Sequence, residues 1–237
     1  MLRKSREGIE WLEFEQLQGI SGLVHGVFLR KGGCSQEPYA SLNMGGGTGD
    51  TPQNIEQNRE RIRQILSIPR LTSGYQVHGS HVAYVPFTGS EECDGMITQE
   101  KGLGLMIKHA DCQAAIFYDP MQKMLANVHA GWRGNVKNIY AETIKKMQAK
   151  GSRVENLLIC ISPSLGPDHA EFINFREELP ASFWEFQIRA TYFDLWAISR
   201  HQLLNQGVLP HHIEIASLCT YQNAEDFTRP SDMDLKL

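Results

Sequence analysis

Three short patches in the middle third of the chain carry the side chains that are best suited to chemistry. They are Gln-Val-His-Gly at 76–79, His-Ala-Asp-Cys at 109–112 and Val-His-Ala-Gly-Trp-Arg-Gly at 128–134. Each patch lies at the end of a segment that predicts a strand. Loops at the strand ends of a rigid sheet often carry binding and catalytic residues. We therefore treat the three patches as candidate site segments.

His78, Cys112 and His129 together offer two imidazole rings and a thiol. Zinc accepts imidazole nitrogen and thiolate sulfur, and a catalytic zinc has three protein ligands with one position open for water or substrate. The three residues lie far apart in the chain, so no local ligand spacing supports the set. Each of them, taken singly, could instead pack or form hydrogen bonds. They are a candidate metal trio that the spacing alone does not assign.

The third patch also predicts a site for an anion. A strand is expected to end at Val128, a turn then carries His129 and Arg133, and a helix is expected to begin near Asn135. The free N–H groups at the start of a helix can hold an anion, and Arg133 could add a bidentate contact. The alternative is an ordinary strand-to-helix turn with an arginine on the surface.

The segments that must position these patches alternate between strand and helix patterns. Strands 103–108 and 114–118 follow one another with only a short turn between them, which argues for a mixed sheet. We therefore predict an α+β fold, a single domain over residues 1–237 with mixed β-sheets flanked by helices. Short apolar, partly β-branched runs predict strands at 24–29, 103–108, 114–118, 124–128, 157–161 and 213–216. Helical spacing predicts helices at 54–66 with Asn54 as N-cap, at 135–150 before Gly151, and at 194–206 before Gly207.

The composition excludes several classes of protein. The chain has 237 residues, of which 41% are hydrophobic and 21% are charged, as in ordinary globular proteins. The net charge of -4 provides no basic field for nucleic acid or anionic lipid. We expect no signal peptide, because no apolar run follows the charged first residues, and no apolar run is long enough to span a membrane. The five cysteines are odd in number and widely spaced, which favours a reduced, cytoplasmic compartment.

The motifs Gln-Val-His-Gly, Ala-Asp-Cys and His-Ala-Gly-Trp-Arg-Gly, in that order, resemble the laccase-domain family. This family is also called YfiH-like or polyphenol-oxidase-like, and its members are described as zinc-dependent purine nucleoside phosphorylases. The resemblance extends from about Val24 to Cys219. Its supporting matches are the segments 30–35, 38–43, 49–50, 56–59, 93–98, 165–167 and 219–220.

The resemblance implies that His78, Cys112 and His129 are zinc ligands, with copper as an adventitious substitute. It implies phosphorolysis of adenosine, inosine, guanosine and methylthioadenosine, and deamination of adenosine. The partners would be a purine nucleoside and phosphate, with the chain as a monomer or a weak dimer. It also implies the YfiH-like fold, which is grouped with cysteine hydrolases of the cytotoxic-necrotizing-factor type.

Further site residues follow from membership of the motifs and from charge. Arg133, Asn43 and Arg30 would line the substrate or phosphate site. Deamination also needs a proton shuttle, for which Asp111 and Asp94 are candidates. The alternative for Asp111 is a carboxylate that supports a ligand or caps a turn.

Several departures from the family pattern are present, and three of them bear on the candidate site. His109 stands where the family often has threonine, and it could be an additional ligand or a supporting residue. Gln113 and its two following alanines stand where the family often has a proline soon after the cysteine. The C-terminal segment 226–237 lacks the arginines with which family members usually end, which weakens the expectation of phosphate binding.

Three other functions stay open at this stage. Cys112 could be a nucleophile activated by His78 or His129, as in a cysteine hydrolase, and a related assignment is a peptidoglycan-editing factor. The altered C-terminus favours a non-catalytic relative that binds a nucleoside. Copper oxidoreductase chemistry is disfavoured, because the nine histidines include no H-x-H pair and no blue-copper ligand set is evident.

Overall fold

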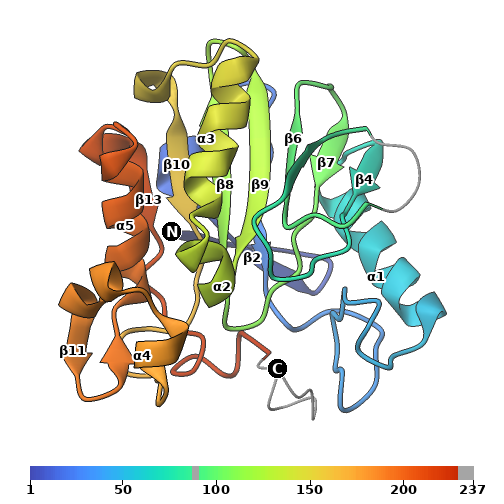
Figure 1. The fold of residues 1–237 in the computed structure, drawn as a ribbon. Coiled ribbons are helices and arrows are strands. Elements are labelled where there is room, and N and C mark those ends of the chain that lie inside the picture. Colours follow the sequence, from blue (N-terminus) through green and yellow to red (C-terminus); the bar gives the residue numbers. More distant parts are fainter. Residues whose placement is uncertain (87–90, 229–237) are drawn as a thin grey trace.

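The computed structural model describes residues 1–86 and 91–228, and it shows an α+β fold around a six-stranded sheet (Figure 1). The six strands are β5 (Val82–Tyr84), β6 (Gly95–Thr98), β8 (Gln113–Asp119), β9 (Met124–Ala130), β10 (Leu158–Ile161) and β13 (Ile213–Ile215). Their order across the sheet is β13-β10-β8-β9-β6-β5. The two outer pairs are parallel and the three inner pairs are antiparallel. The predicted α+β class with a mixed sheet is therefore confirmed.

Helices flank this sheet. The part of the chain that the structure describes contains the α-helices α1 (Pro52–Ile65), α2 (Trp132–Val136), α3 (Ile139–Ala149), α4 (Phe175–Glu178) and α5 (Leu195–Asn205). Short 3₁₀ helices are η1 (Glu15–Leu17), η2 (Val154–Asn156), η3 (Ala181–Phe186) and η4 (Pro210–His212). In Figure 1, α3 lies across the middle of the sheet and α5 lies beside it.

The hairpin of β8 and β9 forms the centre of the core. Its register runs from Gln113 opposite Ala130 to Asp119 opposite Met124. The Asp119 carboxylate closes the turn by accepting from two backbone N–H groups of residues 121 and 122. Both strands are buried along most of their length because both faces of the sheet are covered. On one face lie side chains of α3, namely Ile139, Tyr140, Ile144 and Met147, and on the other lie Phe14 and Leu17.

Smaller sheets complete the fold. A three-stranded sheet contains β1 (Leu2–Arg6), β2 (Ile9–Glu13) and β3 (Val27–Phe28). The two remaining sheets are pairs, β4 (Arg70–Thr72) with β7 (Leu103–Leu105), and β11 (Gln187–Arg189) with β12 (Tyr192–Phe193). The pair β4·β7 is parallel, and the segments that follow these two strands lead to His78 and to Cys112.

The predicted start of the first helix was wrong. Helix α1 begins at Pro52, and its N-cap is Thr51, whose hydroxyl accepts a hydrogen bond from the N–H of Asn54. Asn54 is therefore inside the first turn, and its side chain donates to Asp50. Proline at the first helical position is favourable because its fixed φ suits the helix and its missing N–H would have no partner there.

The predicted helix 135–150 is in fact two helices. Asn138 separates α2 from α3 by adopting a left-handed conformation, with φ of 53°, and its side chain accepts a hydrogen bond from the N–H of Ala141. Helix α2 begins at Trp132, earlier than the predicted Asn135. The periodic apolar stripe hid this break, because Asn138 lies between the apolar positions and changes the backbone without changing the pattern.

Two strand predictions were too long. The predicted strand 24–29 forms ladder hydrogen bonds only as β3. The predicted strand 103–108 ends at Leu105 and pairs with β4, in a different sheet from β8. The central sheet is mixed as predicted, but the short turn between 103–108 and 114–118 was the wrong reason for that prediction.

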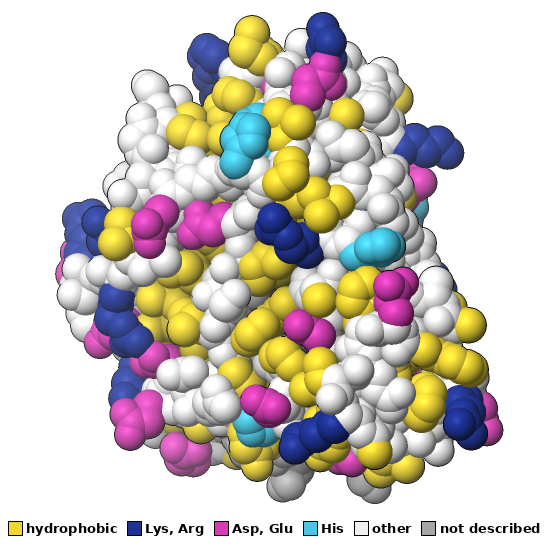
Figure 2. Space-filling model, turned by 90° about the vertical axis from the view of Figure 1, so that its left-hand side faces the viewer, with side chains coloured by type: hydrophobic (Ala, Val, Ile, Leu, Met, Phe, Trp, Pro, Cys, Tyr) yellow, Lys and Arg dark blue, Asp and Glu magenta, His cyan; other side chains and the backbone are white. Residues whose placement is uncertain are grey.

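The described surface offers no large region of one charge on the face that Figure 2 presents. Lysine and arginine side chains alternate there with acidic ones, and hydrophobic side chains lie between them (Figure 2). Within residues 1–86 and 91–228, every helix is too short or too polar to traverse a membrane.

A buried polar network lies behind the strand that follows Cys112. The Gln113 side chain is 1% exposed, and its Oε1 accepts hydrogen bonds from Asn135, Tyr140 and Ser199. Its Nε2 donates to the carbonyl oxygen of Leu195 at 3.2 Å. These contacts tie the start of β8 to α2, α3 and α5. An apolar residue in place of Gln113 would remove the acceptor that these three buried side chains share.

We expect Gln113→Glu to lower the free energy of unfolding by about 3 kcal/mol, because it buries a charge and turns an acceptor toward the Leu195 carbonyl. Urea unfolding measures this change. The matched control is Gln148→Glu, an exposed position on α3, which should change stability by less than about 0.5 kcal/mol. Equal stability of the two variants would contradict the role of the network.

Candidate functional site

His129 lies on β9, one residue before the end of that strand, and its side chain is only 2% exposed. The structure thus corrects the expectation that His129 belongs to the turn, because the ladder continues through Ala130. Its Nδ1 donates a hydrogen bond to the Asp94 carboxylate at 2.9 Å. A carboxylate can only accept at neutral pH, so this bond places the proton on Nδ1. The Nε2 atom is left to face other groups.

Asp94 connects His129 to the loop that carries His78. The Asp94 side chain is fully buried, and it accepts hydrogen bonds from the backbone N–H groups of Val77, His78 and Gly79 at 3.2, 3.0 and 2.7 Å. Burial acts to raise the pKa of Asp94, but the hydrogen bonds from His129 and from the backbone outweigh it and hold the pKa below its usual value. One carboxylate therefore fixes two of the three candidate ligands.

Cys112 reaches the same place from a tight turn before β8. The N–H of Cys112 donates to the carbonyl of Ala110, and Asp111 between them has φ of 66°. Burial alone would raise the pKa of the Cys112 thiol. Hydrogen bonds and positive charge from His129 and His78 outweigh burial and lower that pKa to about 7. The thiol is thus poised to ionise near neutral pH.

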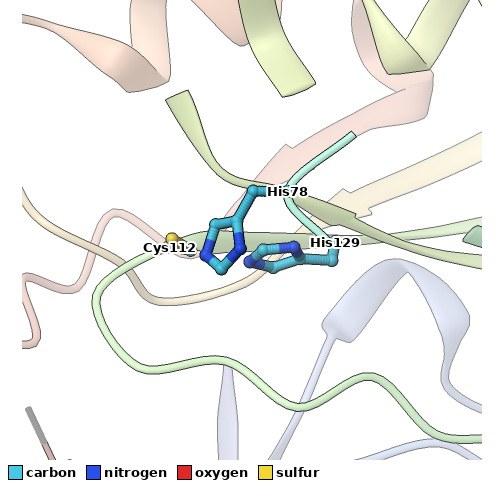
Figure 3. A group of neighbouring side chains, drawn as sticks. All are labelled: His78, Cys112 and His129. Carbon is cyan, nitrogen blue, oxygen red and sulfur yellow. The ribbon is translucent and has the colours of Figure 1, made fainter. Parts of the chain in front are cut away.

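The three side chains meet as a compact group (Figure 3). One ligand atom from each of His78, Cys112 and His129 lies within 4.8 Å of the others. The two imidazole rings stand edge to face, with centroids 4.8 Å apart. Gly131 borders the group, and a Cβ there would lie 3.2 Å from His78 and 3.3 Å from Cys112. The glycine keeps this side of the trio free of a side chain.

The trio has a donor set that could hold a metal ion such as zinc. Two imidazoles and a readily ionised thiol are typical zinc ligands, and three ligands leave one position open. The Nδ1 hydrogen bond of His129 to Asp94 is the outer contact that commonly orients a ligating histidine. Burial acts to lower the pKa of His129, but Asp94 and Cys112 raise it to about 9. A bound cation would therefore displace a proton from His129.

His109 lies beside the trio and outside it. Its Nδ1 donates to the carbonyl oxygen of Cys112 at 2.8 Å, and the cluster of mutually close ligand atoms does not include it. Packing around the ring lowers the pKa of His109 to about 4, and the charge of His129 adds to this effect. The expectation of an additional ligand is therefore not met by this geometry, and His109 supports the backbone of Cys112.

Arg133 is exposed on α2, and its guanidinium lies 4.3 Å from the centre of the Trp132 ring. Helix α2 has only five residues, so the predicted anion site at a helix start is confined to one turn. Asp111 is held by its neighbours, because its carboxylate accepts from Thr220 and its carbonyl from the N–H of Leu165. These contacts match the alternative of a supporting carboxylate, and the shuttle role of Asp111 stays a prediction.

Arg30 and Asn43 organise the segment in which they lie. Arg30 donates to the carbonyls of Ala224 and Ala40, and Asn43 donates to Thr48 and Asp50. Their described hydrogen bonds do not reach His78, Cys112 or His129. The sequence grouped them with the site by motif membership, and the structure gives them local contacts.

Sequence reasoning missed the orienting role of Asp94, which it treated as a candidate proton shuttle. Full burial and four hydrogen bonds leave this carboxylate no route to a substrate. A signal was present, because an aspartate directly before the apolar run 95–98 marks the entry to a buried strand. The partner of that aspartate was not readable from the sequence.

Comparison with known proteins shows similarity along nearly the whole chain. A family model described as multi-copper polyphenol oxidoreductase laccase matches residues 24–228. A protein of Bacteroides thetaiotaomicron named purine nucleoside phosphorylase is 30% identical, over 95% of this chain and 92% of that protein. Escherichia coli YfiH, also named purine nucleoside phosphorylase, is 31% identical over 84% of each chain.

Solved structures show the same fold. The crystal structure of YlmD from Geobacillus stearothermophilus superposes with a TM-score of 0.86 at 27% identity, covering 98% of this chain and 93% of that one. The Bacillus licheniformis protein YfiH superposes with a TM-score of 0.84, covering 98% and 94%. Its identity of 22% supports likeness of fold alone. The predicted YfiH-like architecture is confirmed.

We expect zinc affinity to rise about tenfold per pH unit between pH 7 and 9. In this range Cys112 is ionised with a pKa of about 7, whereas His129 with a pKa of about 9 must release one proton to bind the metal. Below pH 7 the rise should be steeper, because Cys112 must also lose its proton. Competition with a chelator from pH 6 to 9.5 measures the slope.

Asp94→Asn provides the control for this slope. Removing the carboxylate lowers the pKa of His129 toward its ordinary value, so the affinity should change less with pH near pH 8. Circular dichroism shows whether the variant stays folded. The same slope in both folded proteins would contradict the assignment of the released proton to His129.

Proposed function

The chain belongs to the family described as multi-copper polyphenol oxidoreductase laccase, and on that premise we propose that it is a zinc-dependent purine nucleoside phosphorylase. The observation that carries the proposal is the meeting of His78, Cys112 and His129 beside a glycine. Its relatives that are named purine nucleoside phosphorylase support the reaction class. We take residues 1–237 as one domain that acts in the cytoplasm.

The family description does not by itself favour copper oxidation. Multicopper oxidases need several copper centres, and the trio, with its two histidines and a cysteine, offers ligands for only one of them. Among residues 1–86 and 91–228, the trio is the one group of three or more histidine, cysteine or acidic side chains placed to share a metal ion. One centre of this kind suits a single Lewis-acid cation such as zinc, with copper as an adventitious substitute.

In the proposed reaction, an oxygen of inorganic phosphate attacks C1′ of the nucleoside. The bond from C1′ to the purine nitrogen breaks, its electron pair leaves with the base, and a proton is delivered to that base. Ribose 1-phosphate and the free purine are the products. Zinc, when bound, supplies a Lewis acid that positions a reactant and stabilises developing negative charge.

The residues of the chain have distinct parts in this proposal. His78, Cys112 and His129 would hold the zinc, and Asp94 would fix their arrangement through its buried hydrogen bonds. Arg133 is the exposed cation that follows Gly131 on the same turn, so it would bind the phosphate. Arg30 and Asn43 would shape the wall of the substrate site through the segment that they organise.

We propose adenosine, inosine, guanosine and methylthioadenosine as the substrates, with deamination of adenosine as a second activity. Deamination requires a water to attack C6 of adenine and ammonia to leave. Asp111, whose Oδ1 accepts a hydrogen bond from Thr220, would serve as its proton shuttle. We regard phosphorolysis as the principal activity because the relatives are named for it.

We expect the purified protein to bind about one zinc per chain and to release hypoxanthine from inosine only when phosphate is present. His129→Ala should lose the metal and at least about a hundredfold of this activity, because it removes a ligand and the partner of Asp94. Metal analysis of protein prepared without an affinity tag, together with chromatography of the free base, measures both.

His81→Ala is the matched control. His81 is three residues from His78, but its ring is more than half exposed and contacts Glu91, so this variant should keep both zinc and turnover. Turnover without phosphate would contradict phosphorolysis. Zinc and nucleoside binding without turnover would instead support the non-catalytic relative. The altered C-terminus that motivates that alternative falls largely in residues 229–237, outside the described residues.

A cysteine nucleophile is the second candidate, and the paired pKa values favour it. A thiol with a pKa of about 7 beside an imidazole with a pKa of about 9 forms a thiolate–imidazolium pair near pH 8. The same pair would serve a hydrolase or a peptidoglycan-editing factor. The two candidates differ in what zinc does to Cys112.

We expect iodoacetamide to alkylate Cys112 in the metal-free protein and stoichiometric zinc to slow this alkylation at least about tenfold, because a ligated thiolate is no longer a free nucleophile. Peptide mass spectrometry follows Cys112, with the half-buried Cys34 as the internal control. Unchanged alkylation of Cys112 with excess zinc would favour the nucleophile over the metal ligand.

A further inference from the structure

His109 presents one fixed nitrogen and one free nitrogen. Its Nδ1 lies 2.8 Å from the carbonyl oxygen of Cys112. A carbonyl oxygen can only accept, so Nδ1 carries the proton in this contact. The neutral ring therefore has its lone pair on Nε2. The tautomer is set by the backbone of a candidate ligand and does not depend on a substrate.

The Nε2 atom of His109 has no hydrogen-bond partner among the described residues. The residue as a whole is half-buried, and its Nε2 is not fully enclosed by the protein. An acceptor that is held rigidly and left open is suited to bind a donor from a ligand.

The position of the ring connects this acceptor with the candidate metal trio. The Nδ1 of His109 contacts the backbone carbonyl of Cys112, one of the three candidate ligands, at 2.8 Å. Its own ligand atoms stay outside the cluster of His78, Cys112 and His129, so it does not fill the open metal position. His109 and the trio thus share Cys112, since His109 holds the Cys112 backbone and the trio includes its thiol.

We infer that His109 is a substrate-contacting specificity residue whose Nε2 accepts a hydrogen bond from an N–H or O–H donor of the purine nucleoside. The inference rests on the proposed function and adds to it a contact between the substrate and His109. The donor is a base N–H, a base amino group or a ribose hydroxyl. A site built to accept such a donor discriminates against analogues that lack it.

The test compares His109→Asn with the unchanged protein, both loaded with zinc. Asparagine keeps an N–H at the place of Nδ1 for the Cys112 carbonyl and removes the acceptor at Nε2. The substrates are inosine with 1-methylinosine, adenosine with purine riboside, and inosine with its 2′- and 3′-deoxy forms. The first pair differs in a base N–H, the second in the amino group and the last in ribose hydroxyls.

We expect His109→Asn to lower kcat/KM about tenfold for the nucleosides that carry the recognised donor, the factor that corresponds to one net hydrogen bond. For every tested nucleoside that lacks this donor, the variant and the unchanged protein should have equal kcat/KM. Zinc content and melting temperature should not change. His109→Phe removes both nitrogens and should also reduce zinc content, since the Cys112 carbonyl loses its donor.

An equal loss with every nucleoside would overturn the inference, because a purely structural role of His109 acts on all substrates alike. No loss with any nucleoside would also overturn it. If the unchanged protein shows no phosphorolysis, calorimetric dissociation constants for the same nucleosides replace kcat/KM. The same selective pattern in binding would then support the contact while the proposed reaction fails, and no binding at all would overturn both.

Discussion

The candidate site depends on a single buried carboxylate. Asp94 has no exposed surface, and it accepts hydrogen bonds from His129 and from three successive backbone N–H groups at 77–79. A buried carboxylate without such partners would cost several kcal/mol. The chain therefore folds the loop of His78 around Asp94 because the carboxylate needs these donors, and His129 completes the set. The hydrogen bonds that stabilise the Asp94 carboxylate therefore also orient His78 and His129.

Two residues in the site have left-handed backbone conformations. For a residue other than glycine, this conformation costs about 1–3 kcal/mol of free energy. The two residues are His78 with φ of 58° and Asp111 with φ of 66°. Contacts that are distant in sequence hold both of them. The N–H of His78 donates to Asp94, and Asp111 is held by Leu165 and Thr220. The arrangement of the trio is thus a tertiary property, and no local segment would keep it.

This dependence explains how much of the molecule could be predicted from the sequence. Long periodic segments such as 194–206 gave nearly correct helices because their pattern is local. The break at Asn138 was missed because one left-handed residue leaves the apolar pattern intact. The strand 103–108 was overextended because the apolar run continues past Leu105 into the connection to Cys112.

The candidate ligands also show that local patterns are readable from the sequence and that tertiary contacts are not. His78, Cys112 and His129 were brought together by their resemblance to a family, since their spacing carries no ligand pattern. Residue types allowed a metal set but could not show that Asp94 binds His129, because this contact joins the start of one strand to the end of another. The residues that hold a site are less visible in a sequence than those that act in it.

The charge of Asp94 would favour His129 both as a metal ligand and as a catalytic base. The two roles differ in how closely a substrate must approach the His129 ring. Asp94 raises the basicity of His129, which strengthens the imidazole toward either a proton or a cation. His129 is nearly fully buried, so its Nε2 meets Cys112 and His78 and has little room to reach a substrate directly. A cation among the three would contact all of them, and Gly131 leaves room for it because a Cβ there would lie against His78, Cys112 and His129. The geometry therefore favours a site that acts through a metal over one in which His129 acts as a base on the substrate.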